Sequence, residues 1–381
     1  MRTTRRGRAR DHVVRAALRS LAGDRPDSAL VVRALDGPQT DLVESAIAQG
    51  TGPALASMFT EIGGVVPADL RSHVENARFA RAASVGVLRR MTEEFDDHGI
   101  PFVVLKGIVL ASTYPRPEMR AFNDIDVLVE GRDLGRALDA LERIGARDVN
   151  RNWGNYLRHG VAETPVWTPG IGIDLHWHLV GLERERVGVE LDIASMIGRR
   201  RTVDVGGLDV WTLDPTDLLL HTAVHAGRSG ATKLAWLRDV RELVRAEPPD
   251  WDVLVRRSRD AGVGALVGQV LDRARCELGA DVPIEVAEAL CPRPLLGIRR
   301  RLDLRDRGDG LPRRFARGFP VVVSRASIVA SGRAAAGVLA TRVRGDQHWD
   351  VGDPEGPLYW DHPSGGSSGR QAYLEFAGRA G

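Results

Sequence analysis

The hydrophobic periodicity of the chain changes twice along its length, and this pattern constrains the fold more than any other feature. Between residues 12 and 98, apolar residues recur at helical spacing, interrupted by glycine- and proline-containing breaks. Residues 99–213 instead alternate short apolar runs with helical segments, and helical spacing returns from residue 214. We therefore predict an α+β fold, with a small mixed β-sheet core flanked by N-terminal and C-terminal helical regions.

These changes divide the chain into parts. The predicted parts are an N-terminal helical region (1–98), an α/β core (99–213), a C-terminal helical region (214–345) and a tail (346–381). The N-terminal region should end with a long helix that stops before Gly99, because glycine favours helix C-termini. Residues 346–370 of the tail are rich in Gly, Pro and Ser, so we expect this segment to be extended or mobile.

The α/β core should contain short strands separated by turns and helices. A strand at 102–105 ends in Lys106-Gly107 and is followed by a short helix at 108–113. Further strands are expected at 124–129, 161–167 and 170–179, with a helix at 132–144 and a hairpin at 201–213.

The overall composition excludes several classes of protein. Hydrophobic residues make up 43% and charged residues 27% of the 381, which is ordinary for a globular chain and unlike a disordered one or a coiled coil. The net charge of +2 argues against a nucleic-acid coat or a membrane-surface protein. No stretch approaches the ~18 apolar residues of a membrane helix, so we expect a cytoplasmic protein. Cys276 and Cys291 are too few for a disulfide framework or a cysteine zinc site.

Lysine is scarce in this chain. Only Lys106 and Lys233 occur among the 53 basic residues, so the other 51 are arginine. A coding bias toward arginine explains most of this ratio, and both lysines then fall in segments with possible functions.

Asp124 and Asp126 lie two residues apart on a predicted strand, so both carboxylates project from one face. Neighbouring carboxylates repel each other, and a divalent cation offsets that repulsion. An exposed strand end would explain an isolated pair equally well. A further acid, Asp174, lies on a second strand, where His176 and His178 share its face. Three acids on adjacent strands can hold two magnesium ions about 3.5–4 Å apart.

Basic residues near these acids suggest phosphate binding. The Lys106-Gly107 turn ends one strand just before a helix, where backbone N–H groups and the lysine can face phosphate oxygens. Arg116 and Arg120 lie in the loop that leads to Asp124 and are further candidates for phosphate contacts.

Three segments of the sequence resemble those of a known family. The stretch PFVVLKGIVLASTYPRPEMRAFNDIDVLV is similar to the core motif of the uncharacterised nucleotidyltransferase family of the DNA polymerase beta-like superfamily. IDLHWHL resembles its third-acid strand, and DLLLHTAVHAGRSGATKLAWLRDVREL resembles its helical signature. The resemblance covers roughly residues 10–260. A weaker similarity exists to type IV toxin nucleotidyltransferases.

The resemblance implies roles for individual residues. Asp124 and Asp126 would bind both metals, and Asp174 would bridge to the site of the nucleophile. Gly107 would lie against the triphosphate, where the superfamily has a Gly-Ser or Gly-Gly turn. This chain has Ile108 after the glycine and sixteen residues between Gly107 and Asp124.

Basic residues would replace the missing hydroxyl. Lys106 or Arg120 would make the phosphate contact that the serine makes elsewhere in the superfamily. Lys233, at the start of a later helix, would reach the triphosphate. We expect Asp239, on that helix, to form a structural ion pair with Arg238, with Arg241 or with the histidine-containing helix before it.

The implied function is that of an enzyme, a nucleotidyltransferase dependent on Mg²⁺ (or Mn²⁺). It would move an NMP group from an NTP to a hydroxyl or phosphate acceptor by a two-metal mechanism and release pyrophosphate. No residue distinguishes ATP from CTP or GTP as the donor. The balanced charge favours a small-molecule, peptide or protein acceptor, with tRNA still possible and no membrane partner.

Alternatives remain open from the sequence. The missing serine suggests a non-catalytic or regulatory nucleotide-binding module on the same fold. A toxin-like tRNA nucleotidyltransferase is a further possibility. His221 and His225 have the i, i+4 spacing of a two-histidine zinc site, which with His176 and His178 suggests a zinc hydrolase, although Thr222 replaces the usual glutamate. Otherwise His225 would hydrogen-bond at the sheet–helix junction, and His176 would tune Asp174.

Overall fold

A computed structural model describes residues 5–23, 26–35, 39–293, 296 and 363–381. Its contacts divide the chain into two compact units. The helical unit comprises Met1–Arg78, Thr113–Ala121 and Leu219–Ala330, and the sheet unit comprises Phe79–Ser112, Phe122–Leu218 and Ser331–Gly381. Both units are therefore assembled from segments distant in sequence, whereas the predicted parts were continuous.

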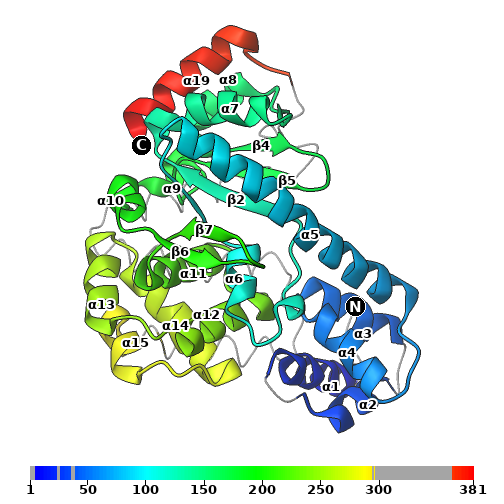
Figure 1. The fold of residues 1–381 in the computed structure, drawn as a ribbon. Helices are drawn as coiled ribbons and strands as arrows, with labels where there is room; N and C mark the ends of the chain where they lie inside the picture. The colour runs from blue at the N-terminus through cyan, green and yellow to red at the C-terminus, as the bar shows by residue number, and fades with distance from the viewer. Residues whose placement is uncertain (1–4, 24–25, 36–38, 294–295, 297–362) are drawn as a thin grey trace. The chain divides into compact units, whose positions relative to one another are not determined.

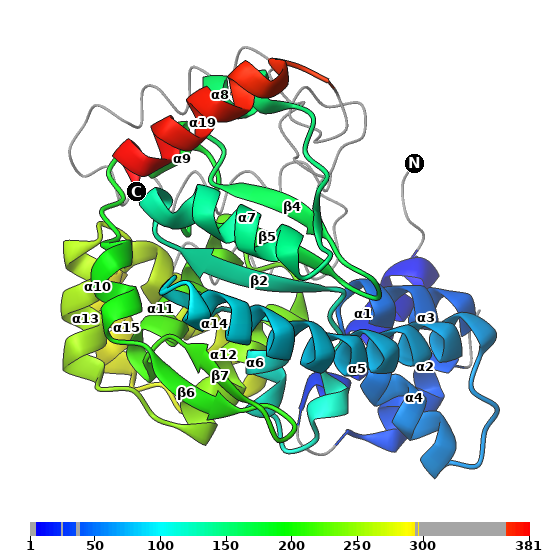
Figure 2. The ribbon, with the colours of Figure 1, turned by 45° about the horizontal axis from the view of Figure 1, so that its top comes forward.

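The sheet unit is built on a five-stranded mixed sheet with the order β1-β2-β5-β4-β3 (Figures 1 and 2). The strands are β1 (Phe102–Val104), β2 (Asp124–Val129), β3 (Arg147–Asp148), β4 (Glu163–Trp167) and β5 (Gly172–His176). β2 and β5 pair in parallel, and the other neighbours are antiparallel. The predicted α+β class and the central strands are confirmed.

Apolar and acidic residues alternate at the start of β2, so they lie on opposite faces of the sheet. Ile125 and Val127 are fully buried, as the sequence predicts, and β1 consists of buried apolar residues alone. The residues on the other face include Asp124 and Asp126, so a largely buried strand brings two carboxylates to one face of the sheet.

Helices and a hairpin complete the sheet unit. The elements are α6 (Ile108–Ser112), η2 (Gly131–Asp133), α7 (Leu134–Arg143), α8 (Trp153–His159), α9 (Glu183–Arg186), α10 (Ile193–Gly198), β6 (Arg201–Asp204) and β7 (Asp209–Thr212), with α5 (Ala68–Asp97) and α11 (Pro215–Arg228) shared with the helical unit. The predicted hairpin forms as β6 and β7. The Thr212 hydroxyl donates a 2.7 Å hydrogen bond to the Val104 carbonyl and so ties the hairpin to β1.

The last helix, α19 (Gly366–Ala380), packs against α8, η2 and α7 (Figure 1). Tyr373 is fully buried: its hydroxyl accepts a hydrogen bond from Trp177 Nε1 (3.0 Å) and donates one to the Val161 carbonyl (2.7 Å). The prediction of an extended or mobile segment covered residues 346–370; residues 346–362 lie outside the described residues, and from Gly366 the segment is helical. Composition concealed this helix, because its small residues allow close packing while Tyr373 and Ala377, one turn apart, form its buried stripe.

The described elements of the helical unit are all helical, as predicted for both flanking regions. They are α1 (Arg5–Ala22), α2 (Ser28–Leu35), α3 (Gln39–Ala48), α4 (Gly52–Glu61), η1 (Pro117–Met119), α12 (Leu234–Ala246), α13 (Trp251–Asp260), α14 (Gly264–Leu278) and α15 (Ile284–Leu290). Helices from the two ends of the sequence pack together, since α1 contacts both α12 and α14. Within the described residues, no helix is long and apolar enough to span a membrane.

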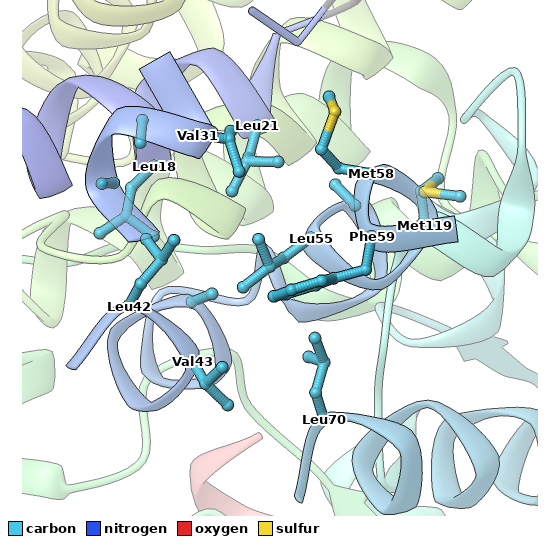
Figure 3. Packing of buried hydrophobic residues seen from close by; sticks show 14 of the residues in the cluster. Leu18, Leu21, Val31, Leu42, Val43, Leu55, Met58, Phe59, Leu70 and Met119 are labelled. Carbon is cyan, nitrogen blue, oxygen red and sulfur yellow. The ribbon is translucent and has the colours of Figure 1, made fainter. Parts of the chain in front are cut away.

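A cluster of buried apolar side chains holds the first helices of this unit together (Figure 3). Leu21, Leu42, Leu55 and Leu70 are fully buried in it. Met119 joins the same cluster from the loop that precedes β2. This loop is therefore packed in the helical unit, although the elements on either side of it belong to the sheet unit.

We expect Tyr373→Phe to lower the free energy of unfolding by about 1–3 kcal/mol, because Trp177 Nε1 and the Val161 carbonyl would be buried without a partner. Urea unfolding measures this change. Gln371→Ala, on the exposed side of the same helix, is the control and should change stability by less than about 0.5 kcal/mol. Equal stabilities of the two variants would show that the hydrogen bonds of the Tyr373 hydroxyl do not stabilise the sheet unit.

Candidate active site

Ionisable side chains gather on one face of the five-stranded sheet. In the parallel pairing of β2 with β5, Asp126 lies opposite Asp174, with Asp124 two residues earlier on the same face. In the antiparallel pairing of β4 with β5, Glu163 lies opposite His176. Because alternate residues of a strand share a face, the register brings the three predicted acids together and adds a fourth carboxylate.

Lys106 lies in the turn after β1, and its side chain contacts this cluster. Its Nζ lies 2.7 Å from Asp126 Oδ1, and the two side chains are 17% and 6% exposed. The turn is tied to β2, because the Leu105 N–H donates a 3.0 Å hydrogen bond to the Asp126 carbonyl. One of the two lysines is thus a direct partner of the predicted metal ligand.

His176 contacts the same carboxylate from the neighbouring strand. Its Nε2 lies 3.2 Å from Asp126 Oδ1, and its Nδ1 lies 3.3 Å from Glu163 Oε2. The imidazole therefore connects Glu163 with Asp126. The sequence analysis predicted that His176 tunes Asp174, and its charge does lower the Asp174 pKa, whereas its direct contacts are with Asp126 and Glu163.

The electrostatics of the cluster follow from these contacts. Burial disfavours the Asp126 carboxylate, but Lys106 and His176 outweigh burial and hold the Asp126 pKa well below its usual value. Burial likewise disfavours the charged forms of Lys106 and His176. The Asp126 charge nevertheless raises the Lys106 pKa, and Asp126 with Glu163 raises the His176 pKa. The three groups form a mutually stabilised ionic cluster.

Asp174 behaves differently from Asp126. Burial, followed by the charges of Glu163, Asp124 and Asp126, raises the Asp174 pKa to about 7, although His176 opposes the shift. The raised pKa of Asp174 therefore reflects its burial first and the charges of the neighbouring carboxylates second. Additional positive charge near Asp174 would stabilise its ionised form.

The donor chemistry of this face fits Mg²⁺ or Mn²⁺, because the oxygens of Asp124, Asp126 and Asp174 are hard ligands. The arrangement itself is not that of a preformed metal site. Among the described residues, no group of three or more His, Cys, Asp or Glu side chains is placed to hold an ion. Lys106 and His176 instead contact Asp126 Oδ1 and supply positive charge there.

The backbone conformation of the turn beside these acids favours glycine at position 107. Its φ of +53° lies in the left-handed region, and a Cβ on this residue would lie 3.1 Å from the Asp124 carbonyl oxygen. The close approach of the turn to β2 therefore explains the glycine independently of any phosphate.

Arg120 belongs to the helical unit, where it is bound by Asp239. Its Nε and Nη2 donate hydrogen bonds of 2.7 and 3.0 Å to the two Asp239 oxygens, and the Tyr114 hydroxyl donates a third of 2.7 Å. The predicted ion pair of Asp239 was with Arg238, Arg241 or the histidine-containing helix. The structure instead pairs Asp239 with a residue 119 positions earlier, which binds the loop before β2 to α12.

Lys233 also lies in the helical unit, where it is the N-cap residue of α12. Its Nζ lies 5.2 Å from the centre of the Trp236 ring, within the range of a cation–π interaction. His225 packs edge-on against Trp236, and its ring lies 6.4 Å from that of His221.

His178 lies in the sheet unit, where its Nδ1 accepts a hydrogen bond from the Val180 N–H.

Glu163 was missed by the sequence analysis. The strand that carries it was predicted at 161–167, but a single acid near a strand end has no distinctive pattern. Recognising it requires the order of the strands, which places β4 next to β5 and so places Glu163 beside His176.

Comparison with known proteins agrees with the sequence resemblance. Residues 37–279 match the model of the family described as "Uncharacterised nucleotidyltransferase". Among solved structures, the antibiotic-resistance factor ANT(2'')-Ia is similar, with 14% identity, a TM-score of 0.34, and coverage of 47% of this chain and 91% of the other. No curated protein gives a significant match.

Gly107→Ala should lower the free energy of unfolding by about 1–3 kcal/mol, because alanine is strained at this positive φ and crowds the Asp124 carbonyl. Gly86→Ala is the matched control in α5, where a Cβ meets nothing within 4 Å. It should raise stability by about 0.5–1 kcal/mol through helix propensity. Urea unfolding of both variants tests the opposite signs, and a stable Gly107→Ala protein would contradict the requirement for glycine.

Asp239→Asn should destabilise the helical unit by about 3 kcal/mol, because the Arg120 guanidinium would lose its buried counter-charge. Thermal unfolding followed by circular dichroism measures the change. Asp252→Asn, an exposed position on α13, should cost at most about 1 kcal/mol. If both variants melt together with the parent protein, the Arg120–Asp239 pair has no anchoring role.

Proposed function

Because this chain belongs to the uncharacterised nucleotidyltransferase family, we propose that it transfers an NMP group from an NTP to a hydroxyl or phosphate acceptor and releases pyrophosphate. The observation that carries the proposal is the register of β2 and β5. It sets Asp126 opposite Asp174, with Asp124 on the same face. Acids on adjacent strands are the arrangement that two-metal phosphoryl chemistry requires.

Asp124, Asp126 and Asp174 are the residues that would hold Mg²⁺ or Mn²⁺. Bound divalent ions lower the pKa of an attacking hydroxyl and neutralise the charge of the departing pyrophosphate. The chain itself then has to bind and orient the reactants. The buried setting of Asp126 and Asp174 strengthens the electrostatic interactions that do so.

Lys106 is the cation of the cluster that is suited to a phosphate oxygen. It lies on the turn beside Asp124 and carries its charge on a flexible stem. For Arg120, the pair with Asp239 favours an anchoring role in the helical unit. A contact of Lys233 with the triphosphate stays a prediction, as does a cytoplasmic location.

The charge of the chain bears on the acceptor. The balanced charge of the chain favours a small molecule, a peptide or a protein over tRNA. The pairing of Asp126 with Lys106 is the one observation that favours the second candidate, a non-catalytic nucleotide-binding module, because in that pairing a predicted metal ligand already has a counter-ion.

The test is transfer of label from each α-³²P-labelled NTP to the components of a cell extract in the presence of Mg²⁺. We expect one class of molecule to become labelled by the parent protein. Asp126→Asn should reduce labelling by about 10²-fold or more, because it removes a charge that would bind the metal at the reacting phosphate. The class of labelled molecule identifies the acceptor.

Asp209→Asn is the matched control, since Asp209 is exposed on β7 of the same unit. It should label the extract like the parent protein. Equal labelling by Asp126→Asn would exclude this site. Nucleotide binding without labelling by any NTP would favour the non-catalytic module.

A further inference from the structure

Carboxylates outnumber basic side chains on this face of the sheet, and Lys106 and His176 both contact the same carboxylate oxygen. Four carboxylates gather there; the Lys106 ammonium contacts Asp126, and the His176 imidazole contacts both Asp126 and Glu163. Both contact Asp126 Oδ1, at 2.7 and 3.2 Å. The positive charge of the cluster is thus concentrated at an oxygen that a divalent ion would use.

Lys106 is attached to the cluster through a rigid turn and a flexible side chain. Its backbone is fixed, because the Leu105 N–H binds the Asp126 carbonyl and the Lys106 carbonyl accepts the Val109 N–H at 3.0 Å. Its side chain is 17% exposed, and the ammonium lies at the end of four methylene groups. The charge can therefore leave Asp126 while the turn stays in place.

We propose that Lys106 is a tethered counter-ion of Asp126, which a divalent ion displaces when it binds. This proposal rests on the proposed function, because the displacing ion is the one that the transfer reaction requires. In the metal-free protein the ammonium, together with His176, stabilises the buried Asp126 carboxylate. When the ion takes its place, two positive charges repel and Lys106 moves toward another anion.

The displaced ammonium links the metal to the nucleotide. An NTP presents phosphate oxygens beside its metal and so offers Lys106 a new partner. A metal without nucleotide has to displace the lysine with no such compensation. Metal and NTP should therefore bind cooperatively, and each should strengthen the binding of the other by the same factor.

The two lysines of the chain allow a direct measurement. Labelling with ¹⁵N-lysine gives only two side-chain ammonium signals in the NMR spectrum, and Lys233→Arg assigns them. When Mg²⁺ is added without nucleotide, at concentrations that saturate binding by calorimetry, the Lys106 signal should shift or disappear while the Lys233 signal stays. Calorimetric binding with an unchanged Lys106 signal would overturn the proposal.

A second measurement uses variants. Lys106→Gln should bind Mn²⁺ alone about tenfold more tightly than the parent protein, because no ammonium competes for Asp126. Lys106→Arg keeps the charge and should not gain affinity. Arg132→Gln, a charge-matched change at a side chain that is 70% exposed, should bind like the parent protein. Thermal unfolding verifies that each variant is folded, and if Lys106→Gln does not fold, the NMR measurement decides.

The outcomes separate this proposal from the proposed function. Unchanged Mn²⁺ affinity in folded Lys106→Gln, with nucleotidyl transfer intact in the parent protein, overturns the counter-ion alone. No Mg²⁺ or Mn²⁺ binding by the parent protein, with or without NTP, overturns both.

Discussion

The parallel pairing of β2 with β5 is the interaction on which the candidate site depends. It determines which residue lies opposite Asp126, and a shift of one residue would turn Asp174 away from the acid face. The apolar residues of both strands prevent that shift, because Ile125, Val127 and Ile173 are buried on the other face. The hydrophobic core thus enforces the proximity of carboxylates that repel each other.

The loop before β2 is anchored in the helical unit by two kinds of contact. Met119 packs into the apolar cluster of the helical unit, and Arg120 with Tyr114 holds Asp239 of α12. The strand with the two acids begins four residues after Arg120. Within the sheet unit, the pairing with β5 determines the position of Asp124.

Local sequence patterns predicted most of the elements around the site, because strands and helices follow from the spacing of nearby residues. The strands with Asp124, Asp126 and Asp174 were predicted, as were the Lys106-Gly107 turn and the hairpin. Contacts between distant residues were not accessible in this way. Glu163 required the strand order, Arg120–Asp239 joins residues 119 apart, and α19 packs through a stripe that composition hides.

The different chemistry of arginine and lysine suits the different contacts of Arg120 and Lys106. Arg120 offers a planar group with several donors, and Asp239 accepts two of them in a bidentate pair that suits a permanent anchor. Lys106 offers a single charge on a flexible stem and meets Asp126 at one oxygen. A contact of this kind breaks at lower cost than a bidentate one. In a chain with 51 arginines, lysine therefore stands where the proposed mechanism needs a charge that moves.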